Sequence, residues 1–142
     1  MVSLGCDHGG YDLKEKVKAH LEGQGIAVKD CGCYSTASCD YPVFGKEAAK
    51  AVASGECEKG IVICTTGIGI SMVANKVKGI RCALCADVFS AKMTRLHNDA
   101  NMLSMGAGIV GPNLALEIVD TFLSTEFSGE EKHLRRINQI EG

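Results

Sequence analysis

Short apolar runs alternate along this chain with longer segments whose apolar residues recur every three or four positions. The runs predict strands at Val2–Leu4, Ile26–Asp30, Gly60–Cys64, Ile80–Cys85 and within Met102–Val110. The longer segments predict helices at Tyr11–Glu22, from Pro42 to about Ser54, and at Gly69–Val77, Val88–Leu96, Pro112–Leu123 and Gly129–Ile140. This alternation predicts an α/β protein in which helices cover both faces of a parallel sheet.

The first helix and the third strand show these patterns most clearly. One apolar stripe is formed by Leu13, Val17 and Leu21, and the nearby lysines are expected mostly away from it: Lys14, Lys16 and Lys18. Gly60–Cys64 is apolar throughout, which predicts a strand buried on both faces. Ligands of such sheets bind at the carboxyl ends of strands. We therefore expect the site in the loops Gly5–Gly10, Gly32–Tyr41, Cys64–Ser71, Ala86–Phe89 and Gly106–Gly108.

The bulk composition narrows the class of protein. A chain of 142 residues, 46% of them hydrophobic, is predicted to form a single domain with its own core. The net charge of -2 favours neither nucleic acid nor a membrane surface as partner. No apolar run approaches the roughly 20 residues of a membrane span, and Met1–Gly10 lacks the basic and apolar segments of a secretion signal. We expect a cytoplasmic protein.

The chain has eight cysteines, at positions 6, 31, 33, 39, 57, 64, 82 and 85. A disulfide framework belongs to secreted proteins, and nothing here indicates secretion. The one CxxC motif begins at Cys82 in a predicted strand, where residues three apart point to opposite faces and cannot share a metal. We therefore expect no metal site, and mostly reduced thiols that are buried or incidental.

The stretch Gly60–Lys76, GIVICTTGIGISMVANK, holds the main candidate for chemistry. Its GIG begins a dinucleotide fingerprint, but Met72 stands where the third glycine belongs, and the glycine spacing also excludes a P-loop. Cys64 instead ends a central strand just before a helix. There the backbone N–H groups of Thr66–Ser71 favour a thiolate and can hold an oxyanion. The alternative is a buried cysteine followed by threonines that cap the helix.

Four stretches occur in the order and spacing of one known family: GCDHGGYDLK, DYPVFG, CTTGIGISMVANKVKGIRCAL and RLHNDANML. Over essentially its whole length the chain resembles the type B ribose-5-phosphate isomerases and the galactose-6-phosphate isomerase subunits. The resemblance implies a cofactor-free aldose–ketose isomerase that works through a cis-enediolate. It also implies a three-layer α/β/α Rossmann-like fold with a five-stranded parallel sheet. The sites would be shared between the subunits of a homodimer or dimer of dimers, with the helix at about 129–141 at the dimer interface.

The resemblance also implies roles for residues. Cys64 is the base that moves a proton between C1 and C2, Thr66 handles the sugar oxygens, and His97 opens the furanose ring. The residues that bind the sugar phosphate are Asp7, His8, Tyr41, Thr65, Gly67, Ile68, Gly69, Ser71, Asn98, Lys132 and Arg136. Several have plainer interpretations: Asp7 and His97 suit helix ends, and Arg135 with Arg136 suits a solvated helix face.

Three positions depart from the family pattern. Thr65 stands where many members have glycine, Gly108 where many have a phosphate-binding arginine, and Lys132 replaces one of two arginines of the tail motif, while Arg136 matches the other. Lysine keeps the charge but loses the bidentate fork. We therefore expect ribose 5-phosphate as substrate, with a hexose 6-phosphate (galactose or allose) as the alternative. A non-catalytic partner subunit that binds sugar phosphate is the alternative of another class.

Overall fold

The computed structural model describes residues 1–142, and its strands form one five-stranded sheet in which every neighbouring pair is parallel. The strands are β1 (Val2–Cys6), β2 (Val28–Asp30), β3 (Lys59–Cys64), β4 (Cys82–Leu84) and β5 (Met102–Gly106), in the spatial order β2-β1-β3-β5-β4. The predicted five-stranded parallel sheet is confirmed. The two edge strands are shorter than the apolar runs predicted, since only three residues of each pair with a neighbour.

The helices lie where the apolar periodicity predicts them. They are α1 (Tyr11–Gly23), α2 (Tyr41–Ala53), α3 (Ile68–Asn75), α4 (Val88–Asn98), α5 (Pro112–Ser124) and α6 (Glu131–Glu141). Pro42 and Pro112 lie in the first turns of α2 and α5, where a missing backbone N–H leaves no helical hydrogen bond unmade. No helix of the chain is both long enough and apolar enough to cross a bilayer.

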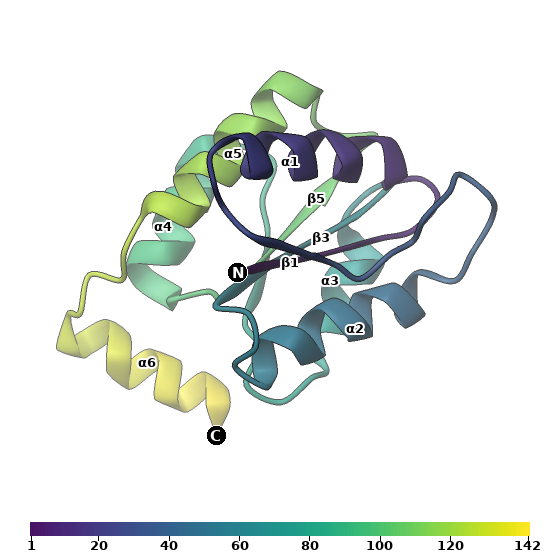
Figure 1. The fold of residues 1–142 in the computed structure, drawn as a ribbon. Coiled ribbons are helices and arrows are strands. Elements are labelled where there is room, and N and C mark those ends of the chain that lie inside the picture. Colours follow the sequence, from purple (N-terminus) through teal and green to yellow (C-terminus); the bar gives the residue numbers. More distant parts are fainter.

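Helices cover both faces of the sheet (Figure 1). One apolar cluster joins the sheet to α1 and α5, and a second joins it to α2 and α3. Gly60–Cys64 of β3 is buried throughout, as predicted for a central strand. Helix α6 packs against α4 and, in yellow, lies away from the sheet in Figure 1.

Lys16 and Lys18 lie away from the buried stripe of α1 as expected, and Lys14 is the exception. Its side chain is fully buried and its Nζ donates to Asp30 Oδ1 at 2.7 Å and to the Cys33 carbonyl at 2.5 Å. Asp30 is the last residue of β2 and Cys33 follows it, so these partners could not be identified from the periodicity of α1 alone. A buried ammonium with such partners ties α1 to the loop that follows β2.

The sheet changes direction of winding between β1 and β3. The chain leaves β1 for β2 on one side and then returns to place β3 on the other side of β1. In sheets of this kind, the loops after the two central strands diverge and leave a crevice at their carboxyl ends. The segments at this position begin at Asp7 and at Thr65.

Candidate active site

The turn between β3 and α3 holds the Cys64 thiol in a defined place. The N–H of Gly67 donates to Cys64 Sγ at 3.1 Å, and Gly67 has the left-handed φ of 77°. A side chain at Gly67 would also meet the backbone of Met105 at 2.7 Å, so both the φ value and the close packing require glycine. The thiol is therefore fixed at the end of a central strand, beside the N-terminus of α3.

Several backbone donors of this turn have no partner within the chain. The N–H groups of Thr65, Thr66 and Gly69 make no intramolecular hydrogen bond, whereas that of Ile68 donates to Thr66 Oγ1 at 3.2 Å. Unpaired N–H groups at a helix start carry partial positive charge. This part of the turn is suited to binding an oxyanion next to Cys64, although the Thr66 hydroxyl already accepts one N–H of the first helical turn.

Two other predicted residues of the turn are placed differently. Ser71 is buried and its hydroxyl donates to the Ile68 carbonyl at 2.7 Å, so it serves the helix itself. Ile68 is the first residue of α3 and its side chain is 47% exposed. The structure brings both residues near Cys64 along the chain, but it directs the Ser71 hydroxyl to the backbone.

The loop after β1 lies directly against this turn. Asp7 is buried, its N–H donates to the Ile63 carbonyl at 3.3 Å, and its carboxylate accepts the N–H of Gly10 at 3.1 Å. A side chain added at Gly9 would overlap Thr65 Oγ1, and the Thr65 carbonyl accepts the N–H of Gly108 at 2.8 Å. Thr65 therefore occupies the space between the loops that follow β1 and β5.

His8 and Tyr41 complete this group of residues. His8 is exposed and its Nδ1 is 3.2 Å from the N–H of Cys39, which donates to it. In the neutral ring the proton must then sit on Nε2, which is left as a donor. The Tyr41 ring lies over Gly69, since a Cβ there would be 2.8–3.0 Å from ring atoms. We call Asp7, His8, Tyr41 and Cys64–Gly69 the Cys64 cluster.

A second group of predicted residues lies on α4 and α6. His97 is exposed in the last turn of α4, and its ring stacks on His133 of α6 with 4.3 Å between ring centroids. Lys132 Nζ lies 3.7 Å from a Glu130 carboxylate oxygen, and Arg136 is exposed on the same helix. We call His97, Asn98, Lys132, His133 and Arg136 the His97 cluster.

His133 was missed as a candidate, although it was visible in the sequence four residues before Ile137 on one face of α6. Both residues are buried, and they attach α6 to the rest of the chain. Loss of water around the ring, together with the neighbouring His97, lowers the pKa of His133. The salt bridge from Arg81 to Glu141, at 2.8 Å, holds the other end of the helix.

The Cys64 cluster and the His97 cluster lie at opposite ends of the strands, the first at their carboxyl ends and the second at their amino ends. In the β3–β5 register Cys64 pairs with Gly106, whereas Met102 pairs with Gly60 at the other end, and Asn98 comes four residues before Met102. Four residue steps along a strand span about 13 Å. Figure 1 shows the same separation, with α6 far from the loops where α1 and α2 begin. One chain alone does not bring Cys64 and His97 together.

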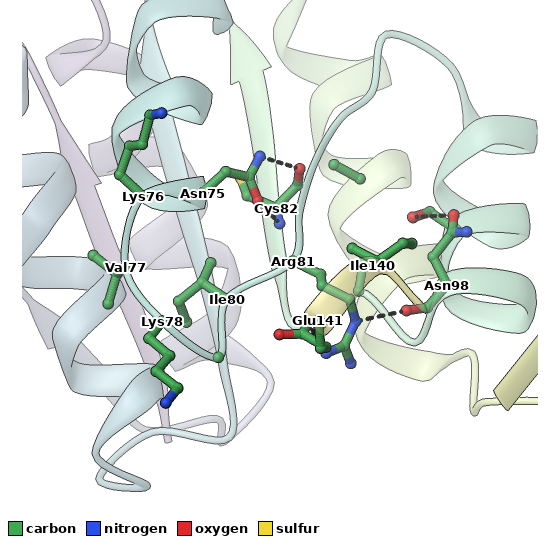
Figure 2. A pocket seen from close by; sticks show the side chains of 14 residues that line it. Asn75, Lys76, Val77, Lys78, Ile80, Arg81, Cys82, Asn98, Ile140 and Glu141 are labelled. Atoms are coloured by element: carbon green, nitrogen blue, oxygen red, sulfur yellow. Dashed lines mark hydrogen bonds and ion pairs between the residues drawn. The ribbon is translucent and has the colours of Figure 1, made fainter. Parts of the chain in front are cut away.

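A cavity lies beside the His97 cluster rather than beside Cys64. It has a volume of about 650 Å³, and Figure 2 shows Asn75, Arg81, Asn98 and Glu141 among its lining residues. Arg81 is fully engaged there, with Nε donating to the Asn98 carbonyl at 2.9 Å and a second nitrogen to Asp99 O at 2.8 Å. Asn98 Oδ1 also accepts the Thr94 hydroxyl at 3.0 Å. All eight cysteines are free, and no three His, Cys, Asp or Glu side chains are grouped as metal ligands.

Comparison with known proteins gives matches that span nearly the whole chain. A sequence model described as ribose/galactose isomerase matches residues 2–140. Ribose-5-phosphate isomerase B of Escherichia coli (strain K12) is 44% identical, with 98% of this chain and 93% of that protein covered. The galactose-6-phosphate isomerase subunit LacB of Clostridium acetobutylicum is 41% identical over 99% of this chain and 82% of that protein. The solved structure of Clostridium thermocellum ribose-5-phosphate isomerase B superposes with a TM-score of 0.97, at 51% identity, covering 99% of this chain and 94% of that one.

Proposed function

Because the chain belongs to the ribose/galactose isomerase family, we propose that it is an aldose–ketose isomerase that interconverts ribose 5-phosphate and ribulose 5-phosphate. The observation that carries this proposal is the environment of Cys64. Its thiol sits at the end of β3, held by the Gly67 N–H at 3.1 Å, and the turn that follows has backbone donors without a partner in the chain. A base next to backbone N–H groups that can stabilise an oxyanion is what proton transfer beside a carbonyl requires.

The chemistry we infer moves one proton between neighbouring carbons. The Cys64 thiolate takes the proton from C2 of the open-chain aldose, the electron pair of that bond forms a C1–C2 double bond, and the charge passes to O1. The unpaired N–H groups of Thr65, Thr66 and Gly69 stabilise this cis-enediolate. The Thr66 hydroxyl relays the proton of O2 to O1, and Cys64 returns its own proton to C1, which leaves the ketose.

Ring opening and phosphate binding require the residues of the His97 cluster. A cyclic sugar must be opened by a general acid–base, for which a histidine suits neutral pH, and we assign this step to His97. Lys132 and Arg136 supply positive charge for the phosphate, with His8 Nε2 as a further donor. His97 and Cys64 lie at opposite ends of the strands of one sheet. We therefore propose a homodimer in which each site is formed by the Cys64 cluster of one copy and the His97 cluster of the other.

The similarity to the LacB subunit favours a second candidate substrate, a hexose 6-phosphate. The two candidates are separated by assaying ribose 5-phosphate, allose 6-phosphate and galactose 6-phosphate side by side, with no metal added. We expect the highest kcat/KM for ribose 5-phosphate. A higher value for either hexose phosphate would change the substrate, and no turnover of any of them would refute the isomerase.

Cys64→Ala tests the assigned base and separates the isomerase from a non-catalytic binder. We expect this variant to lose exchange of the C2 proton with solvent deuterium while it still binds the sugar phosphate. Retained exchange would mean that another residue is the base.

A further inference from the structure

Two buried cysteines are in contact next to the Cys64 cluster, since one of them directly precedes Asp7 in the chain. Cys6 is the last residue of β1, directly before Asp7, and its Sγ lies 3.8 Å from Sγ of Cys33. Their backbones are also neighbours, since the Cys33 N–H donates to the Cys6 carbonyl at 2.9 Å and the Cys6 N–H to the Gly32 carbonyl at 2.7 Å. Neither cysteine takes part in the chemistry assigned to Cys64.

A third cysteine connects this pair to the surface. Cys39 is partly exposed, and burial raises the pKa of its thiol. Its backbone N–H donates to His8 Nδ1 at 3.2 Å, and its Sγ is 3.9 Å from the same nitrogen. Cys33 and Cys39 lie on the same loop between β2 and α2, so one short segment carries a buried thiol of the pair and a partly exposed thiol.

We propose that Cys6 and Cys33 form a reversible disulfide with a low-molecular-weight disulfide such as oxidised glutathione as oxidant, and that Cys39 is its point of entry. The Cys39 thiolate attacks the oxidant, which breaks the external S–S bond, releases one reduced thiol and leaves a mixed disulfide. Cys33 attacks Cys39 Sγ and releases the second reduced thiol. Cys6 then attacks Cys33 Sγ, which forms the Cys6–Cys33 bond and returns Cys39 to a thiol.

Closing this bond changes the loop that holds His8. A disulfide needs its sulfur atoms about 2.05 Å apart, so the two sulfurs must approach from their present separation of 3.8 Å. β1 is paired with strands on both sides, so the movement falls mainly on the loop between β2 and α2. That loop carries the Cys39 N–H that orients His8. Oxidation is therefore expected to lower the isomerase activity, and this effect rests on the proposed function.

The experiment detects the bond itself. The native protein is incubated with oxidised glutathione at pH 8, free thiols are alkylated, and an unreduced tryptic digest is analysed by mass spectrometry. Cys6 lies on the peptide Met1–Lys14 and Cys33 on Asp30–Lys46, so the disulfide appears as this linked pair. Because Cys31 and Cys39 share the second peptide, fragmentation and the variants locate the bond.

Four variants complete the test. We expect the linked pair in the wild type and in Cys57→Ser, which alters a buried thiol of the other apolar cluster, but not in Cys33→Ser, or in Cys33→Ala if that variant folds better. Cys39→Ser should form the link more slowly, and dithiothreitol should remove it from the wild type.

The outcomes are separable from those of the isomerase assay. No linked pair in the wild type, or the same pair in both Cys33 variants, would overturn the disulfide. A linked pair with unchanged activity would overturn its effect on His8. Because the peptides are detected without turnover, an inactive reduced protein would count against the proposed function only.

Discussion

The separation of Cys64 from His97 leads to a quantitative prediction for mixed dimers. Cys64→Ala removes the proposed base at one end of the strands, and His97→Asn removes the proposed ring-opening group at the other end. Each homodimer should be about 10²–10⁴-fold less active on cyclic substrate, because an acid–base group contributes about that much. A dimer with one copy of each variant has one site with both defects and one site with none.

The expected recovery follows from counting sites. If each site takes its two groups from different copies, a purified mixed dimer has one intact site of two and about half of the wild-type activity per protomer. Random pairing of equal amounts of the two variants makes about half of the dimers mixed, so the unfractionated mixture recovers about one quarter. Either value stands far above the residual activity of the parents.

The assay uses two affinity tags, one on each variant, with coexpression and successive purification on both tags. The matched control pairs Cys64→Ala with Thr66→Ala. Both residues belong to the Cys64 cluster, so every site of that mixed dimer carries a defect. The control should stay inactive. A mixed Cys64→Ala/His97→Asn dimer that also stays inactive, or a control that gains activity, would refute the shared site.

Three further predictions concern the scaffold of the site. Lys14→Met leaves Asp30 without its buried partner, although Lys18 and the Gly32 N–H still bind that carboxylate. Urea denaturation should therefore show a loss of about 3 kcal/mol in unfolding free energy, at the low end for a broken buried pair. A loss below about 1 kcal/mol would match an exposed pair instead. Gly9→Ala places a methyl group on Thr65 Oγ1, so kcat/KM should fall about tenfold and recover in the Gly9→Ala/Thr65→Ala double variant, as coupled neighbours do; equal losses in single and double variants would contradict this contact. The pKa of His133 is lowered in the folded chain, so the unfolded chain binds more protons than the folded chain below about pH 6.5 and the unfolding free energy should decrease there. Urea titrations of the wild type and His133→Gln at pH 8 and 5.5 measure this decrease. An equal pH dependence in both proteins would exclude His133 as the source of the decrease.

The positions of the elements could be predicted from the sequence because each has its own local pattern. The four-residue spacing of Leu13, Val17 and Leu21 gave a helix, and the unbroken apolar run of Gly60–Cys64 gave a strand buried on both faces. The fold class and the family followed from these patterns and from the four motif stretches, and both are confirmed. The roles assigned to individual site residues stay predictions.

Features that depend on distant residues could not be predicted. The insertion of β5 between β3 and β4 is a pairing choice that no local pattern encodes. Lys14 looked like a surface lysine because its partner, Asp30, lies 16 residues further on. The contact of Cys6 with Cys33 spans 27 residues and depends on how the loop after β2 lies against β1. Spacing along the chain does not give such distances.

The place of β5 in the sheet also affects the order in which the protein can fold during synthesis. Strand β4 leaves the ribosome before β5, yet β5 is the only strand with which it pairs. Domains generally fold as units, so the sheet cannot be completed around β4 until β5 has been synthesised. The backbone of the Cys64 turn is completed only when Ala107 and Gly108 donate to the carbonyls of Cys64 and Thr65. A nascent chain that has not reached residue 108 therefore contains the Cys64 thiol but not the hydrogen bonds that complete its turn.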